Sequence, residues 1–151
     1  METNRIRNDA LMAEKNRKEK TKVKVILDSN ALFAPLQFKI DIFEELRNLL
    51  KANIEPILLP SVQRELEKLA EHGAPSMRKK AAYALQLAEK CKLIERSGDS
   101  ISTDDDIVKF ASKWKIPVFT NDRMLRRRLR NISVPVIYVR QKSRLEIDGR
   151  I

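Results

Sequence analysis

The amino-acid sequence predicts an α/β fold in which helices cover both faces of a parallel sheet. Short apolar runs rich in β-branched residues alternate with amphipathic helical patterns along the chain. The chain has 151 residues, of which 42% are apolar, so it is long enough to bury one substantial core. The sequence contains no internal repeat and no low-complexity segment. We therefore expect one folded domain over residues 23–151, preceded by an N-terminal arm.

The expected arm comprises residues 1–22. Lysines and arginines are interleaved there with acids, and apolar residues are few. This composition is typical of a basic extension rather than of a packed core. The sequence leaves open whether the arm is helical or frayed.

The first half of the domain begins with a strand over residues 23–27 (VKVIL), directly before Asp28. A helix follows, because apolar residues recur at helical spacing at Ile40, Phe43, Leu46 and Leu50. Residues 56–59 form a short buried strand, and Pro60 suits the first turn of the next helix.

The second half continues the same alternation of helices and short strands. Its helices are expected over residues 76–91, 104–115 and 122–131. Its strands are expected over residues 93–94, 117–119 and 135–139.

Charge and cysteine content restrict the classes of function. The formal net charge is +10 and the isoelectric point is near 9.9, which indicates a polyanionic partner, nucleic acid before membrane. No apolar run approaches the roughly 18 residues of a membrane span, and the N-terminus lacks a signal-peptide pattern. A single cysteine, Cys91, allows no internal disulfide and fits a reducing cytoplasm. With one histidine in the chain, a structural zinc site is not expected.

Two acids directly follow expected strands. Asp28 comes after VKVIL, and Asp122 follows PVFTN. Ligands of open α/β sheets bind beyond the carboxyl ends of the strands, where these acids would lie. Each could instead be an ordinary helix N-cap.

Three consecutive acids, Asp104, Asp105 and Asp106, begin the helix expected over residues 104–115. Ser102 and Thr103 can cap this helix, and acids in its first turn suit the helix dipole. Capping explains one or two of these acids, but hardly all three.

Glu65 is a fourth candidate. It flanks the apolar stripe of the helix SVQRELEKLA, so its side chain can reach toward the acids at the strand ends. An ordinary boundary glutamate is the alternative. If the four acids gather, they repel one another unless a cation neutralises them. Oxygen ligands without histidine or cysteine suit Mg²⁺ or Mn²⁺, which in a basic protein points to phosphate chemistry.

Four motifs, VILDSNAL, SVQREL, STDDDIVKFA and VFTNDRMLRRRL, occur in this order. Together they resemble the acidic motifs of the PIN-domain ribonucleases, over about residues 23–140. The resemblance implies a three-layer α/β/α sandwich around a central parallel sheet. It also implies that the catalytic residues, which bind Mg²⁺ or Mn²⁺, are Asp28, Glu65, Asp104 and Asp122.

The resemblance also ranks the three consecutive acids. Family members show Asp-x-x-Ile-x-x-x-Ala, a pattern that Asp104, Ile107 and Ala111 match. Asp105 is therefore the second choice, and Asp106 is expected to face solvent or to cap the helix. The small polar residues that orient the acids or bind phosphate correspond to Ser29, Asn30 and Thr120.

A basic cluster starts one turn after Asp122, close enough to the expected site to contact an RNA backbone. It consists of Arg123, Arg126, Arg127, Arg128 and Arg130. A solvated helix face is the alternative for this cluster. Aromatic residues make up 5% of the chain, so we expect phosphate contacts to outweigh base stacking.

The function expected from these patterns is a metal-dependent endoribonuclease that cleaves single-stranded or locally unpaired RNA. TNDRMLRRRLRNISVPVIYVR resembles the rRNA-processing PIN nucleases of archaea and eukaryotes more than the VapC-type toxins, so a precursor rRNA is the expected partner. A toxin-type ribonuclease held by an antitoxin is one alternative. An inactive RNA-binding factor for ribosome assembly, with a protein partner, is another. A homodimer is compatible with each, and no membrane partner is expected.

Overall fold

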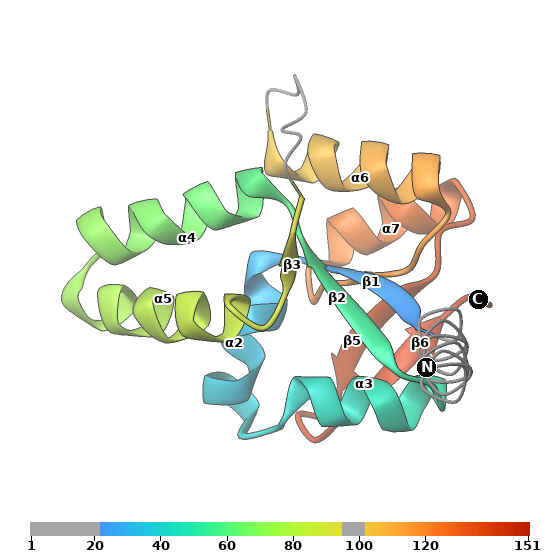
Figure 1. Ribbon diagram of the computed structural model, residues 1–151, viewed down its shortest axis with the longest axis horizontal. Coiled ribbons are helices and arrows are strands. Elements are labelled where there is room, and N and C mark those ends of the chain that lie inside the picture. Colours follow the sequence, from blue (N-terminus) through green and yellow to red (C-terminus); the bar gives the residue numbers. More distant parts are fainter. Residues whose placement is uncertain (1–21, 95–101) are drawn as a thin grey trace, which may run out of the picture.

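The computed structural model describes residues 22–94 and 102–151 of the chain. Within them, six helices pack around a central six-stranded sheet, which confirms the predicted α/β class (Figure 1). The arm expected over residues 1–22 lies outside the described residues except for Lys22. No described helix is both long and apolar enough to cross a membrane.

The first five strands lie within two residues of their expected positions. The strands are β1 (Val23–Leu27), β2 (Ile54–Leu58), β3 (Lys92–Leu93), β4 (Val118–Phe119), β5 (Val136–Arg140) and β6 (Arg144–Asp148). The helices are α2 (Ser29–Phe38), α3 (Ile42–Leu50), α4 (Pro60–His72), α5 (Pro75–Ala88), α6 (Thr103–Trp114) and α7 (Arg123–Asn131).

The order of the strands places a ligand-binding position next to β1. The sheet runs β3-β2-β1-β4-β5-β6, and β1 pairs in parallel with both β2 and β4. The chain therefore leaves β1 toward one edge of the sheet and later returns to its other side. Such a reversal is the topological switch point of an α/β sheet, where ligands bind beyond the strand ends. Asp28 follows β1 there, and Thr120 follows β4.

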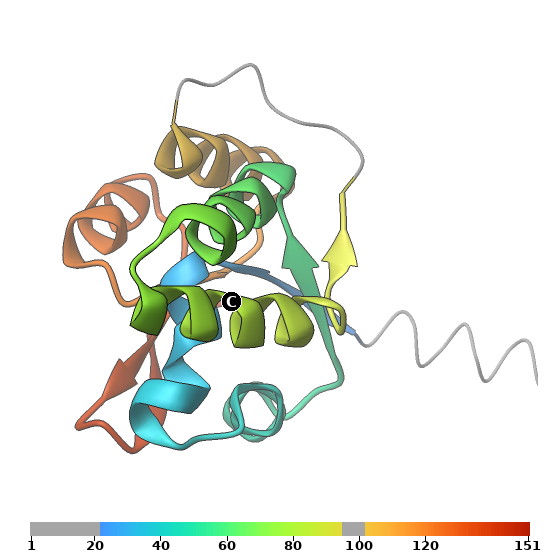
Figure 2. The same ribbon diagram turned by 90° about the vertical axis from the view of Figure 1, so that its left-hand side faces the viewer.

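Helices lie on both sides of the sheet. Figure 1 shows α6 and α7 together above the strands and α3 below them, and Figure 2 shows α4 and α5 packed side by side. Val25, Ile26 and Leu27 of β1 are 0% exposed, as expected for a central strand that is covered on both faces. The layered arrangement agrees with the expected α/β/α sandwich.

The sequence patterns do not predict helix α2. Its buried residues are mostly small (Ser29, Ala31, Leu32 and Ala34), and Pro35 lies inside it, where proline usually ends a helix. The Asp28 side chain accepts a hydrogen bond from the Ser29 N–H and thereby caps the helix. Helix α2 places Ser29 and Asn30 next to Asp28, so it forms part of the site.

The last strand, β6, was not predicted from the sequence, and it is the one strand of the described sheet that is not parallel to its neighbour. β6 pairs antiparallel with β5 across a turn at residues 141–143, and a connection this short permits only antiparallel pairing. Its sequence, RLEID, alternates charged and apolar residues, of which only Leu145 is fully buried. β6 carries two acids, Glu146 and Asp148, that contact arginines near the site.

Candidate active site at the carboxyl ends of β1 and β4

Asp28 ends β1 and begins α2, and its carboxylate is held in one orientation. The residue is 5% exposed. Oδ1 accepts a hydrogen bond of 2.8 Å from the Ser29 N–H. Oδ2 accepts one of 2.8 Å from the Thr120 hydroxyl and one of 3.2 Å from the Asn30 side-chain amide. Asp28 therefore caps α2 and also lies at the switch point, so its role as a cap does not exclude a ligand-binding role.

Asn121 is a site residue that the sequence patterns did not indicate. Its backbone N–H donates to Asn30 Oδ1 at 2.9 Å, and its own Oδ1 accepts a hydrogen bond of 2.8 Å from the Val139 N–H in β5. Thr120 Oγ1 accepts a further bond, of 3.1 Å, from the Asp122 N–H. A continuous hydrogen-bonded frame thus joins the ends of β1, β4 and β5. The polar run TND after a strand is the signal in the sequence that could have indicated it.

The hydroxyl of Thr120, which is 0% exposed, is expected to contribute to the stability of the fold through the bonds of this frame. Thr120→Val preserves the volume of the side chain but leaves Asp28 Oδ2 and the Asp122 N–H without this partner. We expect the free energy of unfolding to fall by about 1–3 kcal/mol, as for other buried polar groups that lose a bond. Urea unfolding of the purified variant measures this loss. Thr120→Ser retains the hydroxyl and should lose less; equal stability of the Val variant and wild type would contradict the claim.

Glu65 and Asp104 approach Asp28 from α4 and α6. Glu65 Oε1 accepts a hydrogen bond of 3.4 Å from the Ser29 hydroxyl. The pKa of Asp28 is raised from 3.8 to about 6, chiefly by burial and in smaller part by the negative charges of Asp104 and Glu65, while its bonds from Thr120 and Ser29 act in the opposite direction. The two acids are therefore near enough to repel the Asp28 carboxylate.

Asp122 lies near Asp104, as its electrostatic effect on that residue shows. Burial raises the pKa of Asp104, and the charge of Asp122 adds to the rise. Asp122 also caps α7, because its Oδ1 accepts bonds of 2.9 and 3.2 Å from the N–H groups of Met124 and Leu125. Its Oδ2 takes no part in the cap. The fold thus brings all four predicted acids to one end of the sheet.

Asp105, the second choice for the site, has a different partner. Its Oδ1 lies 2.7 Å from Arg128 Nη1, and this interaction lowers the pKa of Asp105. The negative charge of the neighbouring Asp104 raises the pKa of Asp28, whereas Asp105 has no such effect on Asp28. The geometry therefore favours Asp104 as the acid that acts with Asp28.

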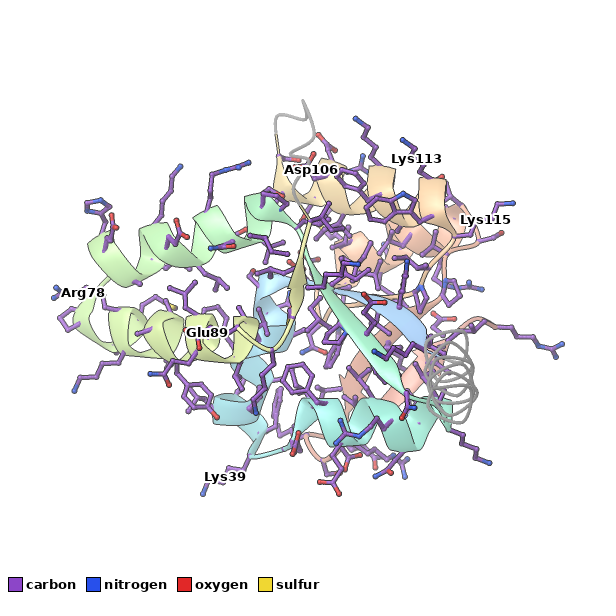
Figure 3. All side chains as sticks on the ribbon, in the orientation of Figure 1. Lys39, Arg78, Glu89, Asp106, Lys113 and Lys115 are labelled. Carbon is purple, nitrogen blue, oxygen red and sulfur yellow. The ribbon has the colours of Figure 1, made fainter. Side chains whose placement is uncertain are left out.

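The expectation that Asp106 faces solvent or caps the helix is wrong. Asp106 is 2% exposed, and its Oδ1 has no hydrogen-bond partner among the described residues. The cap is Ser102, whose hydroxyl accepts a bond from the Asp105 N–H. Figure 3 shows Asp106 in the first turn of α6. Asp106 precedes the buried Ile107, and Phe110, one turn later on the same side, is also buried, so tertiary packing covers this position.

Three of the five arginines predicted to contact RNA bind acids of the chain itself. Arg128 pairs with Asp105, while Arg126 and Arg130 both bind Asp148, with Nε–oxygen distances of 3.0 and 3.2 Å. Arg123 and Arg127 are exposed and have no ion-pair partner within residues 22–94 and 102–151. These two have the most freely available guanidinium groups of the cluster.

The four acids have the donor chemistry of a site for a hard cation. All of their donor atoms are carboxylate oxygens, the ligands that Mg²⁺ and Mn²⁺ prefer. The raised pKa values of Asp28 and Asp104 reflect in part a concentration of negative charge that a cation would neutralise. In the described part of the chain, however, no three acidic, histidine or cysteine side chains already converge closely enough to hold one ion. Metal binding would therefore require some of these side chains to turn.

Comparisons with known proteins agree with this architecture. Residues 25–142 match the family described as "PIN like domain". Ribonuclease VapC4 of Methanocaldococcus jannaschii is 30% identical over 131 residues, which cover 85% of this chain and 98% of the relative. The rRNA-processing protein fcf1 of Schizosaccharomyces pombe is 34% identical over 125 residues, which cover 81% of this chain and 62% of that protein.

Two solved structures share the fold. The PIN domain endonuclease Utp24 superposes with a TM-score of 0.72 and 31% identity, over 85% of this chain and 92% of that one. A domain of a functionally unknown protein from Methanocaldococcus jannaschii superposes with a TM-score of 0.61, over 85% and 99% of the two chains. Its identity is 18%, so this second likeness concerns the fold alone.

Proposed function

Because this chain belongs to the PIN-domain family, we propose that it is a metal-dependent endoribonuclease that cleaves single-stranded or locally unpaired RNA. The observation that carries the proposal is the gathering of Asp28, Glu65, Asp104 and Asp122 at the switch point of the sheet. Such an acidic site in a chain with a net charge of +10 suits a reaction at an anionic substrate.

The residues of the site have distinct roles in this proposal. Asp28, Asp104 and Asp122 would hold Mg²⁺ or Mn²⁺, and Glu65 would help to bind it or position the attacking water. When bound by these residues, such an ion would lower the pKa of water and would help to stabilise the negative charge that develops on the phosphate. The frame formed by Thr120, Asn30 and Asn121 keeps Asp28 in place. In the hydrolysis, a water oxygen would bond to phosphorus and lose a proton to solvent as the bond to the 3′ oxygen breaks, and the 3′ oxygen would take up a proton from solvent and leave as a hydroxyl.

RNA cleavage tests the proposal directly. A 5′-labelled unstructured RNA should be cut with Mn²⁺ or Mg²⁺ present and remain intact with EDTA. Asp104→Asn should reduce the rate at least tenfold, because a metal ligand loses its charge. Asp105→Asn is the matched control, since it changes the adjacent residue and removes only the exposed pair with Arg128. Failure of the wild type to cleave any RNA would sink the proposal, and a larger loss in Asp105→Asn would show that Asp105 is the ligand.

We further propose that the RNA substrate is a precursor rRNA. The likeness to Utp24 and to fcf1, an rRNA-processing protein, supports this target. A toxin-type ribonuclease remains the second candidate, because the chain spans 98% of VapC4 but only 62% of fcf1. Two observations distinguish the candidates. Crosslinking the protein to cellular RNA and finding rRNA precursors enriched would support the first candidate. In the genome, a small overlapping upstream reading frame that encodes a tight inhibitor of the protein would support the second.

A further inference from the structure

A cationic pocket adjoins the carboxylate site at the ends of β4 and β5. Its volume is about 380 Å³, within the usual range of roughly 300–1,000 Å³ for ligand pockets. Arg123, Arg126 and Arg140 line it together with the aromatic residues Phe38 and Tyr138, and no acidic residue is among its lining. Thr120 and Asn121, which belong to the frame around Asp28, form part of its wall. The pocket therefore lies beside the frame that holds Asp28.

The acids behind the pocket do not balance its positive charge. Asp148 is shared by Arg126 and Arg130, and Glu146 is shared by Arg140 and Arg144. Arg126 and Arg140 of the pocket thus each share an acid with an arginine outside its lining. Arg123, the third arginine of the lining, has no ion-pair partner in the described part of the chain. The excess positive charge favours an anionic ligand.

Two arginines of the pocket are held in position before a ligand binds. The Arg126 guanidinium carbon lies 3.8 Å from the centre of the Tyr138 ring, while Arg126 Nε binds Asp148. The Tyr138 hydroxyl and Arg140 Nη1 both bind Glu146 Oε2, at 3.1 and 2.8 Å. Arginines fixed in this way lose less side-chain entropy on binding phosphate than flexible ones do.

We propose that this pocket binds the phosphate of the nucleotide that flanks the cleaved bond in the RNA strand. Arg123 and Arg140 contact the phosphate, and Arg126, stacked on Tyr138, forms the rigid cationic wall. The position of the phosphate relative to the cleaved bond rests on the proposed ribonuclease function. The affinity for phosphate does not, because it follows from the charge and fixed geometry of the pocket.

The test measures binding without cleavage. A fluorescein-labelled uridine tetramer is titrated with protein in EDTA, and fluorescence anisotropy reports the Kd. In three further tetramers, one linkage at a time is a neutral methylphosphonate. We expect one of these linkages to be the most sensitive in the wild type, with a loss of affinity of about tenfold, as for a charge-assisted hydrogen bond. Arg123→Gln and Arg140→Gln should each weaken binding of the unmodified RNA and abolish most of that sensitivity.

Two further comparisons make the test specific. Arg78→Gln on α5, which Figure 3 labels, removes the same charge at a residue that does not line the pocket, and should retain the sensitivity of the wild type. Arg140→Lys keeps the positive charge beside Glu146. If the β5–β6 hairpin is intact, this variant should recover part of the methylphosphonate sensitivity that Arg140→Gln loses. The slope of log Kd against log salt should fall by about 0.7 for each phosphate contact that is lost.

The outcomes separate this proposal from the proposed ribonuclease function. Equal methylphosphonate profiles in the wild type, Arg123→Gln and Arg140→Gln would overturn the pocket assignment even in an active nuclease. Loss of the methylphosphonate sensitivity in both variants would support the pocket assignment. If the protein cleaved no RNA, this result would still support the pocket, and only the ribonuclease function would be refuted.

Discussion

Asp28→Asn is expected to reduce RNA cleavage roughly a hundredfold or more while leaving the fold and RNA affinity nearly unchanged. When a metal ligand loses its charge, the activation free energy of cleavage rises by several kcal/mol, and each rise of about 1.36 kcal/mol slows the reaction tenfold. The fold should survive, because the Asn carboxamide oxygen can still accept the hydrogen bond from the Ser29 N–H. Single-turnover cleavage at saturating Mn²⁺, together with RNA binding in EDTA, measures the two effects separately.

Asp41→Asn is the matched control for this experiment. Asp41 also caps a helix, since its Oδ1 accepts a hydrogen bond from the Glu44 N–H, but it is exposed and is not part of the acidic site. Its replacement should leave cleavage at the wild-type rate. Near-wild-type turnover of Asp28→Asn would show that Asp28 is not required for cleavage. The inactive RNA-binding alternative would then become the leading explanation if no other acid proved essential.

Asp28→Asn is also expected to stabilise the metal-free protein at neutral pH. The pKa of Asp28 is about 6 in the folded protein, above its ordinary value of 3.8, chiefly because the side chain is buried. The folded state therefore binds the proton more tightly than the unfolded state. The contribution of the protonated group to stability is complete below pH 3.8 and is lost as the pH rises through 6. The shift of about 2 pKa units corresponds to a cost on the order of 3 kcal/mol at pH 7 and above.

Urea unfolding in EDTA between pH 5 and pH 8 measures this cost. The wild type should lose stability as the pH rises across this window, and Asp28→Asn should lose distinctly less. Asp41→Asn, whose exposed cap lies outside the acidic site, should follow the wild type. Parallel curves for wild type and Asp28→Asn would show that Asp28 is not destabilised by burial. Added Mn²⁺ should restore stability to the wild type at pH 8 more than to Asp28→Asn, because the cation neutralises the group of acids.

Much of the fold could be predicted from local patterns. Among the parallel strands, β1, β4 and most of β2 and β5 are short apolar runs, which their hydrophobic residues indicate without knowledge of the tertiary structure. Helix α2 escaped prediction because its buried residues are small and Pro35 interrupts the pattern. β6 escaped because only Leu145 of its five residues is fully buried, so its sequence resembles a polar loop.

The positions of the two acids at the strand ends could also be predicted, because they follow from local structure. An acid at or just beyond the end of a buried strand lies at the carboxyl end of the sheet, as Asp28 does after β1 and Asp122 does three residues after β4. The choice among Asp104, Asp105 and Asp106 is different. Successive helical residues point about 100° apart, so the three side chains face three directions. Only the packing of α6 against the sheet and α7 decides which one faces Asp28, which one meets Arg128 and which one is buried.

The sequence by itself therefore determined the α/β class, the order of its parallel strands along the chain and the acids that follow them, because strand propensity and helix capping act over a few neighbouring residues. The tertiary structure alone decided the long-range partners. Asn121 reaches both Asn30 and Val139, and Asp148 neutralises Arg126, a residue 22 positions earlier in the chain. Such contacts depend on strand order and on the antiparallel return of β6, which bring together groups that local patterns cannot relate.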